Sequence, residues 1–298
     1  MTHPALSRLA ARLRRSLGVE QLTERLDAID GRLAGMDRYP NPPLYFGDHT
    51  ALVATRWGGK LMVDTRDAAI APWLVLDSLW EAHVTGWMHQ TLRPGQVFVD
   101  VGANVGYFTV LGGQLVGPGG RVVGIEAHPR LADLLRRNVV LNGLHGHVTT
   151  WHRAAWSTAG DVKLHLRTNF AGNSSVGSIG EAALDRLGDT EDVVEVPAVP
   201  VDELVRPLPP VDVLKVDVEG AELQVFAGLS ETLARSPGIV VMFEWAPAQI
   251  ESVGDAPAAL LDALRAQRFG FRLIEGGLSP ITPEALLELP YGNVVATR

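Results

Sequence analysis

The stretch from Val97 to Glu126 places the strongest constraint on how this chain can fold. An apolar, β-branched run ends in a glycine turn, a helical run follows, and a second apolar run ends in an acid. This pattern predicts a βαβ unit, in which two parallel strands are joined by a crossover helix. We therefore expect an α/β protein with a doubly wound sheet and a ligand site at the first turn.

The turn of this unit reads D-V-G-A-N-V-G over residues 100–106. Gly102 and Gly106 lack a Cβ, so the backbone can turn sharply and a ligand can come close. Free N–H groups at the start of the next helix suit a carboxylate, and Glu126 suits the two hydroxyls of a ribose. Asn104 stands where a dinucleotide-binding turn has a glycine. The turn therefore favours S-adenosylmethionine over NAD, and a glycine turn without any cofactor is the alternative.

Strand-like and helical runs alternate over the rest of the chain, without an internal repeat. Strands are expected over 148–155, 161–166, 193–201, 211–217 and 239–245, with a closing antiparallel hairpin from 271–275 and 293–297. Helices are expected over 74–90, 129–141, about 219–235 and 256–267, the last capped by Asp255, and a hairpin is expected around Gly58-Gly59. Ligands lie beyond the carboxyl ends of such strands. That rule places residues 102–106, Glu126, Ala155, Asp217 and Glu244 around one crevice.

The N-terminal residues 1–40 form a separate part of the predicted organisation. Leucine, isoleucine and methionine recur at steps of four and three between Leu22 and Met36, which indicates a short heptad seam. The seam either pairs with a second copy of the chain or packs on the main domain, and we favour a homo-oligomer formed through this helical arm. Prolines at 40, 42 and 43 mark a boundary before a main domain over 44–298.

The composition excludes several classes of function. The net charge is −8, which argues against a general nucleic-acid surface. The absence of cysteine excludes disulfides, thiolate metal sites and a cysteine nucleophile, and is compatible with the reducing cytoplasm, where we expect the protein to be. No apolar run is long enough to predict a transmembrane segment. A loop over 168–181, rich in Asn, Ser and Gly, is either a substrate lid or an ordinary mobile loop.

Several motifs resemble the FkbM-type S-adenosylmethionine-dependent methyltransferases. They read F-V-D-V-G-A-N-V-G at 98–106, E-A-H-P at 126–129, L-N-G-L at 141–144 and D-V-L-K-V-D-V-E-G-A-E at 212–222. The pair Trp80-Glu81 is similar to an aromatic-Glu pair of that family. The resemblance covers roughly 45–297. It implies a Rossmann-like class I methyltransferase sheet and O-methylation of a sugar or glycan-type hydroxyl, with a polyketide or peptide natural product as the alternative acceptor.

The resemblance also implies a set of cofactor-binding residues. Asp100 and the turn from Gly102 through Asn104 to Gly106 would hold the methionine end, and Glu126 would hold the ribose. Main-chain groups near Ala155 would contact the adenine, and Glu81 and Asp217 are further candidates for the same pocket. We expect Lys215 to be an ion-pair partner of an acid rather than a catalytic residue.

The reaction needs a way to activate the acceptor hydroxyl, because an alcohol is a poor nucleophile near neutral pH. Asp217 and Glu244 end adjacent predicted strands, so we expect them, with Glu219 as a possible third member, to hold Mg²⁺ or to act as the base. In the alternative view Asp217 and Glu219 only shape the pocket and cap a helix. A histidine base, a non-catalytic cofactor-binding module and a nicotinamide dehydrogenase are further alternatives. The expected partner is a small-molecule or oligosaccharide acceptor.

Overall fold

The computed structural model describes residues 42–275 and 277–298. The main unit is Pro43–Arg298. The predicted helical arm over 1–40, and the self-association proposed for it, lie outside the described residues. No helix within the described part of the chain is both long and apolar enough to cross a membrane.

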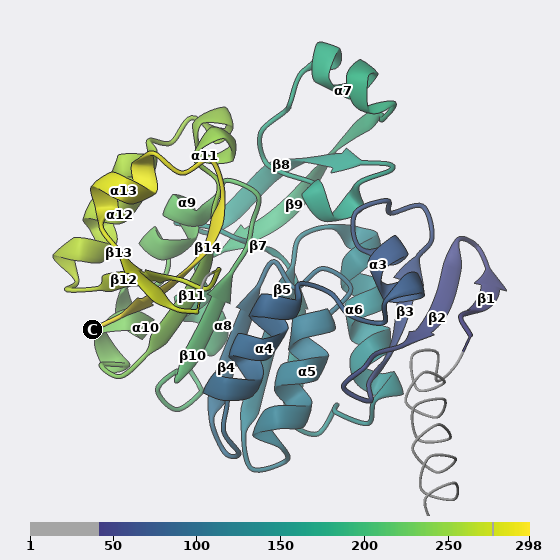
Figure 1. Ribbon diagram of the computed structural model, residues 1–298, viewed down its shortest axis with the longest axis horizontal. Helices are drawn as coiled ribbons and strands as arrows, with labels where there is room; N and C mark the ends of the chain where they lie inside the picture. Colours follow the sequence, from purple (N-terminus) through teal and green to yellow (C-terminus); the bar gives the residue numbers. More distant parts are fainter. Residues whose placement is uncertain (1–41, 276) are drawn as a thin grey trace, which may run out of the picture. The chain divides into compact units, whose positions relative to one another are not determined.

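An eight-stranded mixed sheet forms the centre of this unit, in the order β13-β12-β14-β11-β10-β4-β5-β6 (Figure 1). Strands β11, β10, β4, β5 and β6 are parallel, whereas β14 runs antiparallel to β11 and to β12. The doubly wound sheet and its closing antiparallel hairpin are therefore confirmed. The bounds are β4 Val97–Val101, β5 Arg121–Glu126, β6 Val148–His152, β10 Val213–Val216, β11 Val240–Trp245, β12 Gly270–Leu273, β13 Ser279–Ile281 and β14 Gly292–Thr297.

Helices cover both faces of this sheet and bury a separate apolar cluster on each. Alternation along β4 shows the division, because Phe98 belongs to one cluster and Val99 belongs to the other. The first cluster includes residues of α3 Ala71–Leu76, α4 Ala82–Thr91, α5 Tyr107–Val116 and α6 Pro129–Leu141. The second includes residues of α8 Val201–Val205, α9 Glu222–Ala227, α10 Ser230–Arg235, α11 Pro247–Val253, α12 Pro257–Ala266 and α13 Pro283–Leu287.

Two small sheets flank the central one. The first has the order β1-β2-β3, with bounds Leu44–Gly47, Thr50–Ala54 and Lys60–Asp64. The second has the order β7-β9-β8, with bounds Ala154–Ala155, Glu191–Val199 and Gly160–Arg167, and α7 Glu181–Leu187 lies at the outer end of its long hairpin (Figure 1). The predicted hairpin around Gly58-Gly59 is present, but its loop is longer than two residues, since the Thr55 N–H donates to the Gly59 carbonyl at 2.9 Å.

Some predicted elements are interrupted in the structure. The single helix expected over 74–90 is wrong, because the chain breaks at Trp80-Glu81 between α3 and α4. The helix expected up to about residue 235 is α9 and α10, with a break at Gly228, where a Cβ would lie 2.2 Å from the Trp156 carbonyl oxygen. The strand expected over 148–155 divides into β6 and β7, which belong to different sheets. Asp255 is not the cap of α12, since Ala256 holds that position and Asp255 accepts from the Gln224 amide.

Candidate active site

A cavity of about 310 Å³ lies at the carboxyl ends of the parallel strands. Its wall is formed by the turn after β4, the end of β5, the loop after β10, the end of β11 and the segment 171–176. It also includes the Trp80-Glu81 break. The cavity thus brings together most of the residues selected from the sequence: Glu81, Gly102, Asn104, Glu126, Ala155, Asp217 and Glu244. Asp100 and Gly106 do not line it.

The two glycines of the turn have different tasks. Gly102 has φ +77°, and a Cβ there would lie 1.6 Å from the Asp217 carbonyl oxygen, so only glycine allows β4 and β10 to end so close together. Gly106 has φ +90° and precedes α5, and its Cβ would lie 2.6 Å from the Leu135 side chain. Gly106 therefore permits the packing of α5 on α6, while Gly102 shapes the cavity wall itself.

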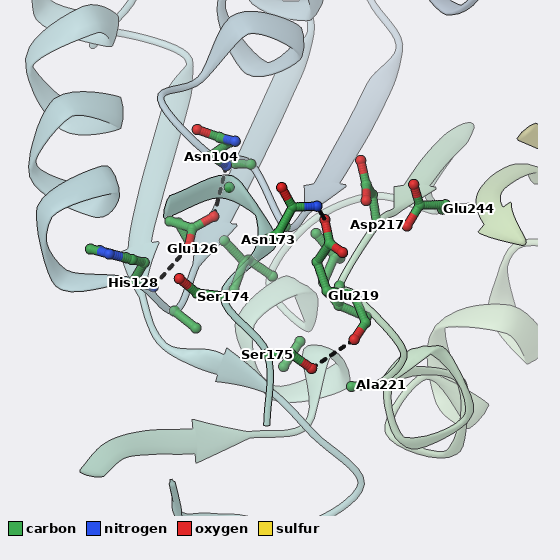
Figure 2. A pocket seen from close by; sticks show the side chains of 18 of the residues that line it. Asn104, Glu126, His128, Asn173, Ser174, Ser175, Asp217, Glu219, Ala221 and Glu244 are labelled. Atoms are coloured by element: carbon green, nitrogen blue, oxygen red, sulfur yellow. Dashed lines mark hydrogen bonds between the residues drawn. The ribbon is translucent and has the colours of Figure 1, made fainter. Parts of the chain in front are cut away.

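Glu126 is held in place by backbone donors from two loops. The Asn104 N–H, at φ +52°, donates to Oε2 at 2.7 Å, and the His128 N–H donates to Oε1 at 2.7 Å (Figure 2). Burial raises the pKa of Glu126 to about 7, although these hydrogen bonds lower it. Each carboxylate oxygen keeps a further lone pair that can accept a hydrogen bond from a ribose hydroxyl. The geometry therefore fits the diol of a nucleoside.

Lys215 of β10, which also lines the cavity, pairs with Asp217 just after its own strand and with Asp100 of the adjacent β4. Its Nζ lies 2.8 Å from Asp217 Oδ2 and 3.9 Å from Asp100 Oδ1, and 5.2 Å from the centre of the Phe108 ring. Burial by itself lowers the pKa of Lys215. The facing carboxylates of Asp217 and Asp100 raise this pKa by more than burial lowers it, so the pKa of Lys215 lies above its usual value. The interpretation of Lys215 as an ion-pair partner is confirmed.

Asp100 is completely buried behind the turn. Its Oδ2 accepts from the Thr109 hydroxyl at 2.6 Å, and burial raises its pKa to about 6. It supports the turn and Lys215 from below, and its direct contact with a cofactor stays a prediction.

Three carboxylates converge on the opposite side of the cavity. Asp217, Glu219 and Glu244 each offer an oxygen, and these oxygens all lie within 4.8 Å of one another (Figure 2). Glu219 accepts from the Asn173 amide at 3.1 Å and from the Gln249 amide at 2.5 Å. In the described part of the chain, Glu244 Oε2 is buried without a hydrogen-bond partner. Oxygen donors in such a group suit a divalent cation such as Mg²⁺.

The pKa values in this group reflect burial of like charges. Burial raises the pKa of Glu219 to about 8, and the neighbouring Asp217 raises it as well. The pKa of Glu244 is raised well above its usual value by burial and then by Asp217 and Glu219. The Tyr291 hydroxyl lies beside Glu244 and partly offsets this rise in the pKa of Glu244. A cation placed among these carboxylates would relieve their mutual repulsion.

The loop that carries Asp217 and Glu219 is ordered by the acid at its end. Glu222, at the start of α9, accepts from the N–H groups of Val218 and Gly220 at 3.2 and 3.4 Å. Gly220 has φ +104°, and a Cβ there would lie 2.4 Å from the Gln249 carbonyl oxygen. The D-V-E-G-A-E motif therefore specifies a tight turn that presents two acids to the cavity, and its second glutamate stabilises that turn.

Glu81 occupies a strained position between α3 and α4. Its backbone has φ +39°, and its buried Oε2 has no hydrogen-bond partner among the described residues. The Thr85 hydroxyl donates to the carbonyl of Trp80 at 2.7 Å and so fixes the break. Burial raises the pKa of Glu81 to about 7, with a further contribution from Asp217. Left-handed backbone at a non-glycine residue costs free energy and is often retained at functional sites.

The polar loop over 168–181 contributes to the cavity wall through its first half. It contains the short 3₁₀ helix η1 Ala171–Asn173, and the Gly172 N–H donates to Asp67 at 3.3 Å. The Ser175 hydroxyl donates to the Glu219 carbonyl at 2.7 Å (Figure 2). The loop thus lies against the acidic group, as a substrate loop would, although movement of this loop remains a prediction.

Sequence reasoning missed several residues of the wall. Asn173 lies in the loop over 168–181, which the sequence predicts as a candidate substrate lid without selecting this residue. Gln249, in α11, and Tyr291, just before β14, carry no sequence signal that distinguishes them from other surface residues. Strands β11 and β14 pair with each other and place Glu244 opposite Asn293. The ends of these two strands bring Gln249 and Tyr291 to the acids.

Comparison with known proteins identifies the family. The methyltransferase FkbM domain matches residues 100–273. The chain belongs to the FkbM methyltransferase family. The family resemblance of the sequence motifs is therefore confirmed, and the protein is an S-adenosylmethionine-dependent methyltransferase.

Characterised relatives align with parts of this FkbM-family chain. Methyltransferase sdnD of Sordaria araneosa is 31% identical over 175 residues, which are 51% of this chain and 67% of that protein. The 31-O-demethyl-FK506 methyltransferase FkbM of Streptomyces tacrolimicus is 30% identical over 161 residues, 47% of this chain and 62% of that protein. A protein-L-isoaspartate O-methyltransferase of Aeropyrum pernix is 45% identical over 67 residues, 22% of this chain and 26% of its own length.

Solved structures of methyltransferases show more distant similarity. An O-methyltransferase from Bacillus cereus in complex with SAH has 18% identity and a TM-score of 0.40, covering 72% of this chain and 78% of that one. An S-adenosylmethionine-dependent O-methyltransferase from Thermotoga maritima has 13% identity and a TM-score of 0.41, covering 88% and 96%.

Proposed function

We propose that this methyltransferase transfers the methyl group of S-adenosylmethionine to a hydroxyl of a small-molecule acceptor. One observation carries the proposal: the carboxylates of Asp217, Glu219 and Glu244 lie in the same cavity as two cofactor-binding features. These features are the turn at Gly102 and Glu126, whose carboxylate can accept hydrogen bonds from a ribose. The cofactor supplies an activated methyl group. What the protein must add is alignment of a hydroxyl and removal of its proton.

The cofactor is proposed to lie along the turn after β4. Glu126 would accept the ribose hydroxyls, while the backbone from Gly102 to Asn104 and main-chain groups near Ala155 would contact the methionine and adenine ends. The acids on the far side, including Asp217, suit the positive charges of the sulfonium and the amino group. Arg153 and Ala155 both line the cavity next to Glu126, which supports this direction of binding.

Asp217, Glu219 and Glu244 are proposed to hold Mg²⁺. The fit rests on their converging oxygens and on Glu244 Oε2, which has no hydrogen-bond partner among the described residues. When bound, Mg²⁺ lowers the pKa of a hydroxyl that it contacts. Chelator tests this proposal, because full methyl transfer in its presence would leave Asp217 or Glu244 as the proton acceptor instead.

Calorimetric titration with S-adenosylmethionine, with NAD⁺ titrated in parallel, is the primary test of the function. Binding of S-adenosylmethionine alone supports the proposal, and SAH release is then measured against a panel of alcohols with and without Mg²⁺. Binding of NAD⁺ alone would indicate that Asn104 and the turn had been misinterpreted. Binding of neither ligand would shift the function to a structural or assembly role.

The acceptor class has two candidates, a sugar or glycan-type hydroxyl and a hydroxyl of a polyketide or peptide natural product. The second is favoured by the Streptomyces relative, whose name assigns it to 31-O-demethyl-FK506. Methyl transfer to matched alcohols from the two classes distinguishes them.

Self-association through residues 1–40 also remains a proposal, supported by the heptad seam between Leu22 and Met36. Deletion of residues 1–40 is expected to reduce the solution mass from an oligomer to a monomer. An unchanged oligomeric state, measured by light scattering, would reject the arm as the contact. The cytoplasmic location expected from the absence of cysteine likewise stays a prediction.

A further inference from the structure

A second recess shares the Trp80-Glu81 break with the cavity. It is an open recess with a volume of about 400 Å³, lined by Trp73, Leu79, Trp80 and Ala82, with Arg56, Asp77 and Glu81 as charged residues. We call this site the tryptophan recess. Trp80 and Glu81 line both the recess and the cofactor cavity, so a single ligand can occupy the recess and still reach Glu81.

The residues that the structure describes leave a large apolar surface of the recess exposed. Trp73 is 56% exposed, although it is one of the largest apolar side chains in the chain. Binding sites for small molecules combine apolar and aromatic walls with a few convergent polar groups. Here the wall is Trp73, Leu79 and Trp80, and the convergent polar group is Glu81, whose buried Oε2 has no partner among the described residues.

The charged residues of the recess are partly committed to the fold. Arg56 Nε donates to the carbonyl of Asp77 at 2.7 Å, at the C-terminal end of α3, and the Arg56 N–H donates to the Ser78 carbonyl at 2.9 Å. A cation at this end of a helix satisfies carbonyls that lack helical partners. Arg56 therefore holds α3 in place, and the recess keeps few polar atoms that could bind the several hydroxyls of a sugar.

We propose that the tryptophan recess is the acceptor subsite and that it takes an alcohol with a mainly hydrocarbon body, whose hydroxyl passes beside the Glu81 carboxylate into the cavity that Asp217, Glu219 and Glu244 also line. This inference rests on the proposed O-methyl transfer and specifies its substrate class. The hydrocarbon body removes the Trp73 and Trp80 surfaces from water, while the hydroxyl donates to the unpartnered Glu81 oxygen. A polyhydroxylated ring would lose water from its hydroxyls in the recess without gaining equivalent partners.

The test uses the full chain with S-adenosylmethionine and three probes, cyclohexanol, 4-tert-butylcyclohexanol and methyl glucoside. Initial rates of SAH formation give kcat/KM for each probe. The ratio for 4-tert-butylcyclohexanol over cyclohexanol is expected to be roughly tenfold or more, because added apolar groups in an apolar pocket give discrimination of that size. Trp73→Ala is expected to bring this ratio close to one, and Trp73→Phe to retain part of it.

A matched control keeps the comparison specific. Tyr45 is 64% exposed in β1 and does not line the recess, so Tyr45→Ala removes an exposed aromatic residue and should leave the ratio unchanged. A ratio that survives Trp73→Ala overturns the inference. Preferred turnover of methyl glucoside overturns it as well and assigns the acceptor to the sugars.

Calorimetry separates failure of this inference from failure of the proposed function. If the SAH-saturated protein does not bind 4-tert-butylcyclohexanol, the recess is not an acceptor subsite, although the methyltransferase function stands. If the protein does not bind SAH, the proposed function itself fails. Binding of 4-tert-butylcyclohexanol that is lost in Trp73→Ala and retained in Tyr45→Ala supports the inference even where turnover is slow.

Discussion

At the scale of single residues, the site depends on glycines that have no room for a Cβ as much as on its polar side chains. The missing Cβ of Gly102 lets the end of β4 meet the carbonyl of Asp217, and that of Gly220 lets the acidic loop meet α11. Asn104 and Glu219 hold left-handed backbone without being glycine, and in each case the backbone or side chain contacts another functional group. Strain of this kind persists where the surroundings enforce it.

Gly102→Ala is expected to be strongly destabilising. The new Cβ would lie 1.6 Å from the Asp217 carbonyl oxygen at a backbone φ of +77°, so the ends of β4 and β10 must separate. We expect a loss of about 2–4 kcal/mol in the free energy of unfolding. Gly146→Ala is the control, because no atom lies within 4 Å of its Cβ and its φ is not positive. Equal unfolding midpoints for the two variants in urea would contradict this prediction.

Asp217→Asn separates catalysis from cofactor binding. The change removes a carboxylate from the group with Glu219 and Glu244 while keeping nearly the same shape. We expect kcat to fall about 100-fold or more, since general-base or metal-assisted steps contribute on that scale. SAH affinity by calorimetry should stay within a few fold. Unchanged turnover would remove Asp217 from the mechanism.

At the scale of elements, several side chains at α6 fasten the first small sheet to the helical layer: Asn142 bonds to Lys60, Arg130 pairs with Asp64, and Asn138 makes the most deeply buried contact. Asn138 of α6 is completely buried. It accepts from the Met62 N–H at 2.7 Å and donates to the carbonyls of Met62 at 2.9 Å and Val105 at 2.7 Å. The same amide thus joins β3, α6 and the turn after β4, and positions the sheet whose following loop leads to α3 and the tryptophan recess.

Asn138→Ala is expected to cost about 2–4 kcal/mol of stability. The substitution leaves the partly buried N–H and carbonyl of Met62 and the buried carbonyl of Val105 without their partner. Each unsatisfied buried group costs about 1–3 kcal/mol. Val140→Ala, at a residue 57% exposed on the same helix, serves as the control and should change stability by less than about 1 kcal/mol. Chemical denaturation of both variants gives the comparison, and similar losses would show that Asn138 does not join these elements.

The break between α3 and α4 shows where reasoning about elements from sequence reached its limit. Apolar residues from 74 to 88 fit a helical repeat. Neither glycine nor proline occurs within four residues of the Trp80-Glu81 pair, so the sequence contains no sign of a break there. At the break, the local hydrogen bond from the Thr85 hydroxyl to the Trp80 carbonyl is joined by two tertiary contacts, Thr85 with the Tyr107 hydroxyl and Arg56 with the carbonyl at the end of α3. The contacts of Arg56 and Tyr107 come from distant parts of the sequence, so local periodicity does not predict them.

At the scale of the whole molecule, buried carboxyl groups oppose folding of the cofactor-free protein as pH rises. The native pKa values of Glu81, Glu126 and Glu222 are raised to about 7, and that of Glu219 to about 8, chiefly by burial. An acid whose native pKa exceeds its unfolded value contributes most stability below the unfolded pKa and loses it as pH rises through the native pKa. Burial lowers the pKa of His128 to about 4. This residue makes the free energy of unfolding rise with pH, but only below its unfolded pKa of 6.5.

The free energy of unfolding is therefore expected to fall between pH 6.5 and pH 8, by about 2 kcal/mol or more, since one pKa unit corresponds to about 1.4 kcal/mol. The measurement is urea unfolding at both pH values, with chelator present and without cofactor. The Glu219→Gln variant should show a shallower dependence, because it removes one of these titrating groups. Stability that rises with pH over this interval would contradict the assignment of raised pKa values.

The sequence by itself determined the sheet, the closing hairpin and most members of the cofactor side of the cavity. Those features depend on local chemistry: β-branched runs form the buried strands, glycine permits the left-handed turn at Gly102, and the spacing from Gly106 places Glu126 at the end of β5. The tight D-V-E-G-A-E turn is determined in the same way, because Gly220 and Glu222 act within a few residues of one another.

Only the tertiary structure decided how the acids meet and where an acceptor could bind. Gln249 and Tyr291 reach Glu219 and Glu244 from segments far along the chain, and Trp73 reaches the Trp80-Glu81 break by the folding of α3 against the first small sheet. Their positions depend on packing between distant segments, which leaves no periodicity in the sequence. The oxygens on Glu81 and Glu244 that have no hydrogen-bond partner within residues 42–275 and 277–298 are likewise visible only once the surrounding residues are in place.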